Sequence, residues 1–221
     1  MDRKQETAVG CHAQVTVLGA RGSIPVSGGQ YQIYGGATAS VLLETGMDGG
    51  CSSQAVLFDA GSGIMNLPER IWKQHTQVHV FLSHFHLDHL VGIPMSRMLF
   101  DETAEVIFYA QDGDRIREAF GQMMSAPLWP VGPEAFRAKI SYRSVGERPV
   151  ILDDGSDSRN GIAPVKISAM QVTHPGGATA FRADWKDFSM VYATDCDLDG
   201  EAVCGLADFA RETDLLILDA Q

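Results

Sequence analysis

The sequence predicts one domain of mixed α and β structure, with two packed β-sheets covered by helices. Three observations favour this fold class. The chain has 221 residues, 45% of them hydrophobic, which is enough to bury a substantial core. Short apolar runs typical of strands recur along the chain, and helical patterns are inserted singly between them. No linker-like segment divides the chain, so we expect residues 13–221 to form one domain after a polar leader at 1–12.

Four strands and one helix are expected in the first part of the chain. The strands cover residues 14–19, 40–45, 55–59 and 78–83, each an apolar or β-branched run. A glycine-rich loop follows the first strand, and the Gly49–Gly50 pair predicts a turn between the second and third. Ser62 is the expected N-cap of a helix over about 64–73, whose apolar residues share one helical face.

The rest of the chain repeats this alternation of strands with single helices. Further strands are expected at 106–109, 139–144, 165–173, 179–185, 189–194 and 215–218. Helices are expected at 112–124 and at about 201–211, and a proline-rich loop at 127–133 interrupts the middle of the chain. This order of elements is the basis of the two-sheet prediction.

The charge and the termini exclude several classes of protein. The chain has 28 acidic and 17 basic residues, for a formal net charge of −11. Nucleic-acid-binding proteins neutralise phosphates with basic residues, so this composition disfavours nucleic acid as a partner. No apolar run approaches the roughly 18 residues that cross a bilayer, and the N-terminus lacks the apolar stretch of a signal peptide. The four cysteines show no C-x-x-C spacing. We therefore expect a soluble cytoplasmic protein with reduced thiols and no membrane partner.

One segment, SHFHLDH, concentrates side chains that bind metals. It holds three of the chain's seven histidines and one aspartate. On an extended segment, residues two apart point the same way, so His84 and His86 can share one ion. Asp88 and His89 come next, just before the helix that we expect to begin at residues 90–92. They would face a neighbouring ion. Imidazole and carboxylate ligands suit Zn²⁺, with Mn²⁺ or Fe as alternatives.

This H-x-H-x-D-H segment resembles the signature of the metallo-β-lactamase superfamily, and the resemblance extends over nearly the whole chain. Asp59, which follows a strand, resembles the first-motif aspartate that braces the metal ligands. His174, in the segment THPGG, is similar to the third-motif histidine. Asp195, in YATD, is similar to the aspartate that bridges both ions. The resemblance implies a four-layer αββα sandwich.

Three other segments resemble the phosphodiesterase and ribonuclease Z branch of that superfamily. They are GARGSIP at 19–25, YGG at 34–36 and LDAQ at 218–221. In the first of them, Arg21 and Ser23 could contact a phosphate. One departure follows the second: the familiar Asn-Thr-Ser is replaced by ATAS at 37–40, which removes one loop hydrogen bond and leaves the expected fold unchanged.

The resemblance implies two metal ions and the roles of two acids. The implied ligands are His84, His86 and His174 for one ion, Asp88 and His89 for the second, and Asp195 between the two. A hydroxide that bridges the ions would attack phosphorus, with Asp88 orienting this nucleophile. Asp219 would position a proton donor for the leaving oxygen.

The resemblance also reveals a missing ligand. In the family, the second ion takes a late histidine shortly beyond the acidic segment that matches 218–221, whereas no histidine follows His174 here. The histidines at 12, 75 and 79 lie in other parts of the pattern, and His79, on an apolar strand, is expected to be structural. We therefore expect that the sequence is truncated at its C-terminus. The alternative is an incomplete second metal site.

The function that these residues predict is that of a metal-dependent hydrolase, specifically a phosphodiesterase. Its expected cofactors are two divalent ions, zinc first, and its expected partner is a small-molecule or nucleotide phosphodiester. The sequence leaves open whether the chain forms a homodimer. The alternatives are a ribonuclease Z-like endonuclease that processes tRNA 3′ ends, hydrolysis of a lactam, thioester or other acyl bond, and a metal-binding module with little or no turnover because the last ligand histidine is absent.

Overall fold

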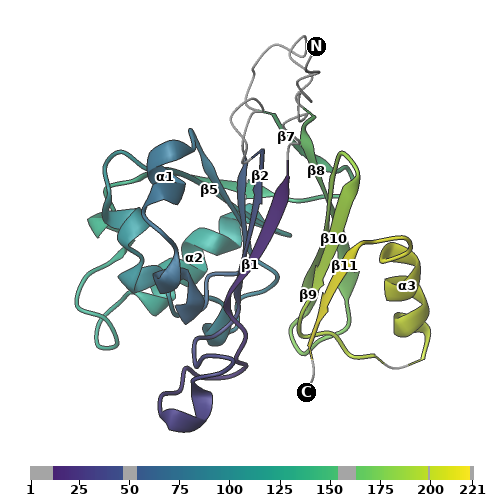
Figure 1. The fold of residues 1–221 in the computed structure, drawn as a ribbon. Coiled ribbons are helices and arrows are strands. Elements are labelled where there is room, and N and C mark those ends of the chain that lie inside the picture. The colour runs from purple at the N-terminus through teal and green to yellow at the C-terminus, as the bar shows by residue number, and fades with distance from the viewer. Residues whose placement is uncertain (1–11, 47–53, 154–162, 199, 220–221) are drawn as a thin grey trace, which may run out of the picture.

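Two β-sheets face one another, and helices lie against both outer faces (Figure 1). The computed structural model describes residues 12–46, 54–153, 163–198 and 200–219. The expected Gly49–Gly50 turn and all of the expected leader except His12 lie outside the described residues. The prediction of a four-layer αββα sandwich is confirmed.

The first sheet has six strands in sequential order. They are β1 (Ala13–Gly19), β2 (Ser40–Thr45), β3 (Ala55–Phe58), β4 (Val78–Phe81), β5 (Glu105–Ala110) and β6 (Lys139–Ser144). Strands β1 to β3 pair antiparallel, whereas β3 to β6 pair in parallel. Parallel strands need crossover connections, and these carry α1 (Arg70–Gln74) and α2 (Gly113–Met123) over the outer face. The carboxyl ends of β3 and β4 therefore open at the same edge.

The second sheet has five strands in the order β11-β10-β9-β8-β7. They are β7 (Val150–Leu152), β8 (Val165–Val172), β9 (Ala178–Trp185), β10 (Phe188–Ala193) and β11 (Leu215–Leu218). Pairing is antiparallel except between β10 and β11, which α3 (Glu201–Phe209) connects. In Figure 1, α3 covers the outer face of this sheet.

Short 3₁₀ turns fill many of the connections. Those in the described residues are Gly29–Tyr31, Ser62–Asn66, Leu87–His89, Ile93–Met95, Arg97–Phe100 and Pro133–Ala135. Among the described residues, no helix has the length and apolar character that crossing a bilayer requires.

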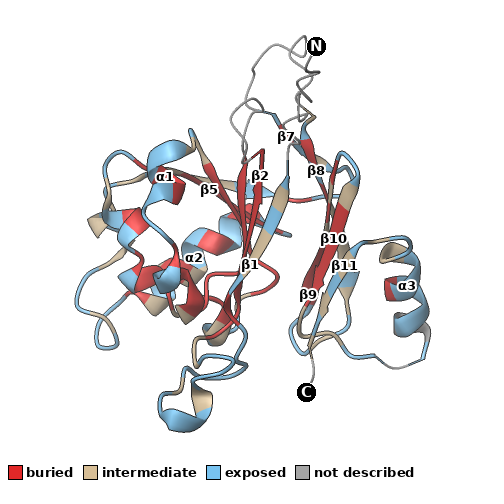
Figure 2. Cartoon of the chain, viewed as in Figure 1, coloured by how far each residue is buried: buried red, intermediate tan, exposed pale blue. Residues whose placement is uncertain are grey.

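Aromatic side chains fill the space between the two sheets. Phe58 and Phe81, at the ends of β3 and β4, pack against Phe181 and Tyr192 of the opposite sheet, with ring centroids 5.4–6.1 Å apart. Each of these rings is fully or almost fully buried, and a buried aromatic ring removes about 150–250 Å² from water. Figure 2 shows buried residues along the strands of both sheets. This aromatic core holds together the strand ends that carry the functional residues.

Most of the predicted elements are confirmed. Each predicted strand is present within two residues of its expected bounds, and so are the helices α2 and α3. Asp112 caps α2, since its carboxylate accepts a hydrogen bond from the Asp114 amide at 3.0 Å. Strand β7 was not predicted, because three residues after Pro149 are too short to show an alternating pattern.

The single helix predicted over 64–73 is wrong. The segment forms a 3₁₀ turn at Ser62–Asn66 and then the short helix α1, which begins at Arg70. Pro68 explains the break, because proline has no amide hydrogen and disfavours the helical conformation of the residue before it. That residue, Leu67, is extended, with φ −62° and ψ 123°.

Two smaller expectations are also wrong. Ser62 does not cap a helix: its hydroxyl accepts a hydrogen bond from the Thr38 amide at 2.8 Å. No α-helix begins at residues 90–92 either. Instead, the Gly92 amide donates a hydrogen bond to the carbonyl of Ala60, in the loop after β3, at 3.1 Å.

His79 is a buried titratable group on β4. Its Nδ1 lies 3.1 Å from the hydroxyl of Tyr109, and its side chain is 6% exposed. Burial, and then the charge of Arg143, lower the pKa of its imidazole to about 4. The pKa of an unfolded histidine is near 6.5. Between pH 6.5 and 4 the unfolded state therefore binds more protons than the folded state, and the free energy of unfolding falls as the pH falls.

We therefore expect wild-type protein to lose more stability than His79→Gln as the pH falls from about 6.5 to 4. The difference should reach the order of 3 kcal/mol, because one pKa unit corresponds to about 1.4 kcal/mol. Urea denaturation of both metal-free proteins across this range measures the effect. Parallel stability curves for the two proteins would contradict the prediction.

Candidate metal centre

Loops from both sheets meet at one end of the sandwich. Each of four strands carries a candidate residue or segment just beyond its carboxyl end: Asp59 after β3, His84–His89 after β4, His174 after β8 and Asp195 after β10. The Thr179 amide, on β9, donates to the Ser83 carbonyl at 2.9 Å. This bond connects the second sheet to the loop at residues 83–89, called the histidine loop below. The structure thus brings together residues that lie far apart in the sequence.

The carboxylate of Asp59 is completely buried and accepts four hydrogen bonds. The Ser83 amide donates to Oδ1 at 2.7 Å, and the Ser83 hydroxyl to Oδ2 at 2.8 Å. The Tyr192 hydroxyl also donates to Oδ2, at 2.8 Å, and His89 Nδ1 donates to it at 2.7 Å. Asp59 thus connects β3, the histidine loop and the second sheet.

Electrostatics keep Asp59 ionised and orient His89. Burial alone would raise the pKa of Asp59, but the adjacent His89 and the hydrogen bond from Ser83 hold it below its usual value. With Nδ1 of His89 committed to this carboxylate, Nε2 faces the other candidate ligands. A carboxylate in this position would fix the tautomer and ring orientation of a ligand histidine.

The loop after β3 packs backbone to backbone against the histidine loop. The Ala60 amide donates to the His89 carbonyl at 2.8 Å. A Cβ atom on Gly61 would collide with the carbonyl oxygen of Asp88, and a Cβ atom on Gly92 with that of Gly61. Glycine is therefore required at both positions for this close approach.

Three histidines form a first group of potential ligands. His84, His86 and His174 each offer a ring nitrogen, and these nitrogens lie within 4.8 Å of one another. His86 Nδ1 lies 3.1 Å from His174 Nε2. The set matches the ligands that the resemblance implied for one ion.

A second group shares His84 and adds His89 and Asp195, again with ligand atoms within 4.8 Å. His89 Nε2 lies 2.9 Å from Oδ2 of Asp195, whose Oδ1 lies 3.9 Å from His174 Nε2. The two oxygens of Asp195 therefore face the two groups, as expected of a bridging aspartate. Asp88 borders the second group, with Oδ2 3.5 Å from His89 Nε2.

The donor set fits divalent metal ions. The buried Nε2 of His84 has no hydrogen-bond partner among the described residues, which is costly for a polar atom unless something else binds it. Burial, and then the charge of His89, lower the pKa of His84 to about 4, so this imidazole is neutral. For His89, burial opposes the charged form, but Asp59 and Asp195 outweigh it and raise the pKa to about 10. The site attracts positive charge and presents an unused nitrogen.

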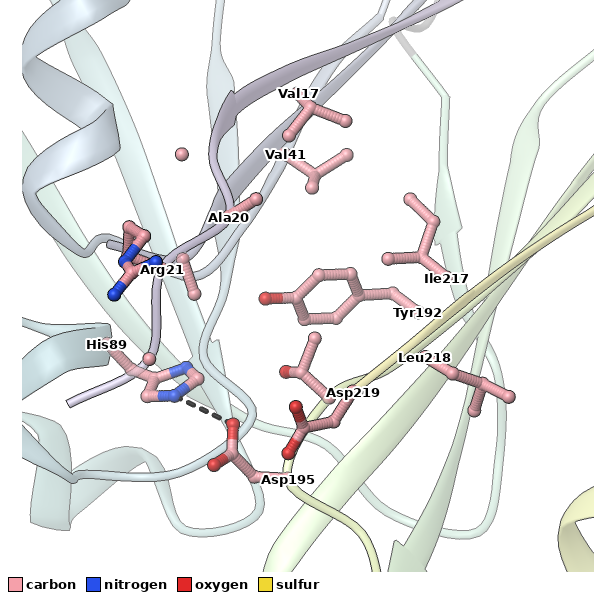
Figure 3. A pocket seen from close by; sticks show the side chains of 14 residues that line it. Val17, Ala20, Arg21, Val41, His89, Tyr192, Asp195, Ile217, Leu218 and Asp219 are labelled. Atoms are coloured by element: carbon pink, nitrogen blue, oxygen red, sulfur yellow. Dashed lines mark ion pairs between the residues drawn. The ribbon is translucent and has the colours of Figure 1, made fainter. Parts of the chain in front are cut away.

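A cavity of about 430 Å³ opens beside the second group. Figure 3 shows Arg21 and His89 on one side of it, and Asp195 and Asp219 on the other. Asp219 is half-buried and follows β11, as expected of an acid at a strand end. It lines the cavity, while the two ligand groups contain neither Asp219 nor Asp88.

Two contacts that orient the site were not predicted from the sequence. Tyr192 holds Asp59 from the opposite sheet, and the Ser23 amide donates to Oδ2 of Asp88 at 2.8 Å. Both contacts join segments that only the packing of the two sheets and of the long first loop brings together. Ser23 was noted as a possible phosphate contact, and its positive φ of 65° was not readable from the sequence.

Comparisons with known proteins agree with this fold. The family model described as "Beta-lactamase superfamily domain" matches residues 54–221. The fold is similar to that of the metallo-β-lactamase fold protein YhfI from Bacillus subtilis, with a TM-score of 0.60 and 20% identity over 92% of this chain and 69% of that one. It is also similar to the short form of human tRNase Z (ELAC1), with a TM-score of 0.54 and 19% identity over 93% of this chain and 76% of that one. A comparison with curated protein sequences found no match.

We expect Tyr192→Phe to weaken zinc binding by about tenfold or more, because groups that orient a ligand histidine typically contribute this much. The substitution removes the hydroxyl that donates to Asp59 and leaves every candidate ligand in place. Competition with a chromophoric chelator measures the affinity. Tyr142→Phe, on β6, is the matched control and should bind zinc as the wild type does. Equal affinities for all three proteins would contradict the bracing role of Tyr192.

Proposed function

Because this chain belongs to the β-lactamase superfamily, we propose that it is a metal-dependent hydrolase that acts on phosphodiesters. The observation that carries the proposal is the pair of ligand groups that share His84 and lie side by side. Two-metal sites of this kind suit phosphoryl transfer, because one ion can stabilise the attacking oxygen and the other the leaving oxygen. The structurally similar human protein is named a tRNase, and RNA is a phosphodiester polymer.

The chain's ligands divide between two divalent ions, for which zinc is the best match. His84, His86 and His174 would hold one ion, Asp88 and His89 the other, and Asp195 would contact both. When bound, such ions polarise phosphoryl oxygens and make water a better nucleophile at neutral pH.

Two carboxylates would handle the protons of the reaction. The Ser23 amide fixes Oδ2 of Asp88, so Oδ1 can accept a proton from the attacking water. Asp219 lies across the cavity, next to Asp195, and would position a proton donor for the leaving oxygen. Attack and departure would thus be served by two different carboxylates, of which Asp219 lines the cavity and Asp88 borders the second ligand group.

We expect His84→Ala to lower the hydrolysis of bis(4-nitrophenyl) phosphate by more than about 100-fold, since it removes one of the three histidine nitrogens proposed to hold the first ion. Chelation of the metal should cause a loss of the same order, and zinc should restore activity to the wild type only. Initial rates, together with the zinc content of each protein, measure both effects.

His79→Gln is the matched control, because this histidine lies on β4, the strand that precedes His84, and outside the ligand groups. It should retain both zinc and activity at neutral pH. Hydrolysis of the diester that survives complete removal of metal would contradict the proposal.

A ribonuclease Z-like endonuclease is the second candidate, and the similarity to human tRNase Z favours it. The net charge of −11 opposes it, because affinity for RNA comes largely from neutralised phosphates. We expect a tRNA precursor to bind weakly and to be cleaved no faster than the small diester. Tight binding that falls steeply as salt rises, with cleavage at the 3′ end, would instead establish the endonuclease.

A further inference from the structure

Arg21 lines the same cavity as His89, Asp195 and Asp219. In Figure 3 its side chain lies on the wall opposite the two aspartates. The other charged groups that line this cavity, apart from His89, are these two carboxylates. The fold therefore places the Arg21 side chain in the same cavity as two residues of the second ligand group.

The backbone around Arg21 is fixed relative to the histidine loop. The Arg21 amide donates to the Ala37 carbonyl at 3.0 Å, and Arg21 forms an isolated parallel β-bridge with Thr38. Two residues later, the Ser23 amide bonds to Asp88, and Ser23 takes up a left-handed conformation to do so. Such strain persists only where surrounding contacts determine the backbone. The loop that carries Arg21 is thus anchored to a candidate metal ligand.

The guanidinium of Arg21 is held in place but is not neutralised. It lies over the ring of Tyr31, 5.1 Å from the ring centroid, and the side chain is exposed. Among the described residues, no carboxylate forms an ion pair with it. Arg70 and Arg182, by contrast, are paired with Glu44 and Asp184. Stacking on an aromatic ring orients the guanidinium and leaves its N–H donors available.

We propose that Arg21 binds the anionic group of the substrate, by donating to the non-bridging oxygens of a phosphate ester. This inference rests on the proposed phosphodiesterase function and specifies its substrate as an anion. The planar guanidinium matches two phosphate oxygens at once. The two acids that line the cavity lie on its other wall: Asp195 bonds His89, and among the described residues neither Asp195 nor Asp219 forms an ion pair with Arg21. An unpaired cation in a strongly acidic chain therefore selects for an anionic ligand at this point.

The test compares Arg21→Gln and Arg21→Lys with wild-type, zinc-loaded protein. Arg21→Gln should raise the KM for bis(4-nitrophenyl) phosphate by about tenfold or more, with the larger part of the loss in KM rather than kcat. It should weaken the binding of inorganic phosphate, measured by calorimetry, by a similar factor. Arg21→Lys should fall between the two, because it keeps the charge and loses the paired donors.

Arg117→Gln is the matched control, since Arg117 stacks on Tyr142 at the same 5.1 Å but lies on α2, outside this cavity. It should bind phosphate and diester as the wild type does. Zinc content, measured for each variant, separates loss of anion binding from loss of metal.

The possible outcomes distinguish this inference from the proposed function. Diester hydrolysis with phosphate binding and KM unchanged in Arg21→Gln would overturn the role of Arg21 alone. Phosphate binding that depends on Arg21, without hydrolysis of any diester, would overturn the phosphodiesterase proposal and support the anion site. A wild-type protein that neither binds phosphate nor hydrolyses the diester would overturn both.

Discussion

A single buried carboxylate, that of Asp59, organises the candidate metal centre. Removing an ionised carboxylate from water costs several kcal/mol unless hydrogen bonds and an opposite charge compensate for it. Here four donors converge on it, from Ser83, His89 and Tyr192. These donors come from the first sheet's loop and from the second sheet, so the carboxylate is satisfied only when the two sheets are correctly apposed. The same requirement that stabilises Asp59 therefore places His89 in the site.

The backbone at the strand ends serves the same purpose. Asp59 and Asp195 are both non-glycine residues with positive φ, at 60° and 54°. Each follows directly or closely on a strand whose last residues belong to the core between or behind the sheets. Beneath them, Phe58 stacks on Tyr192 across the sheets, with ring centroids 5.4 Å apart. A rigid aromatic contact thus supports two strained turns, and the strain is retained because the packing around it leaves no alternative.

The predictable part of this protein was local in sequence. The strands and the H-x-H-x-D-H segment are periodic or dense patterns in the sequence. The strands therefore form close to their predicted bounds. The wrong prediction of one helix over 64–73 also has a local cause, since Pro68 interrupts an otherwise helical pattern. What could not be predicted depends on pairs far apart in the chain. Tyr192 bonds Asp59 across 133 positions, and Ser23 bonds Asp88 across 65. Neither pair has a pattern of its own, because each is produced by the packing of whole elements.

The distribution of charge around the site links metal binding to substrate binding. Asp59, Asp88, Asp195 and Asp219 bring four carboxylates to one end of a chain whose net charge is −11. Without metal, the positive charges that line the described part of the cavity are the proton on His89 and the guanidinium of Arg21, and an anionic ester would be repelled. Two divalent ions would add four positive charges at the same place and reverse the sign of the local field. An acidic chain can therefore suit an anionic substrate, provided that its carboxylates are directed at metal rather than at solvent.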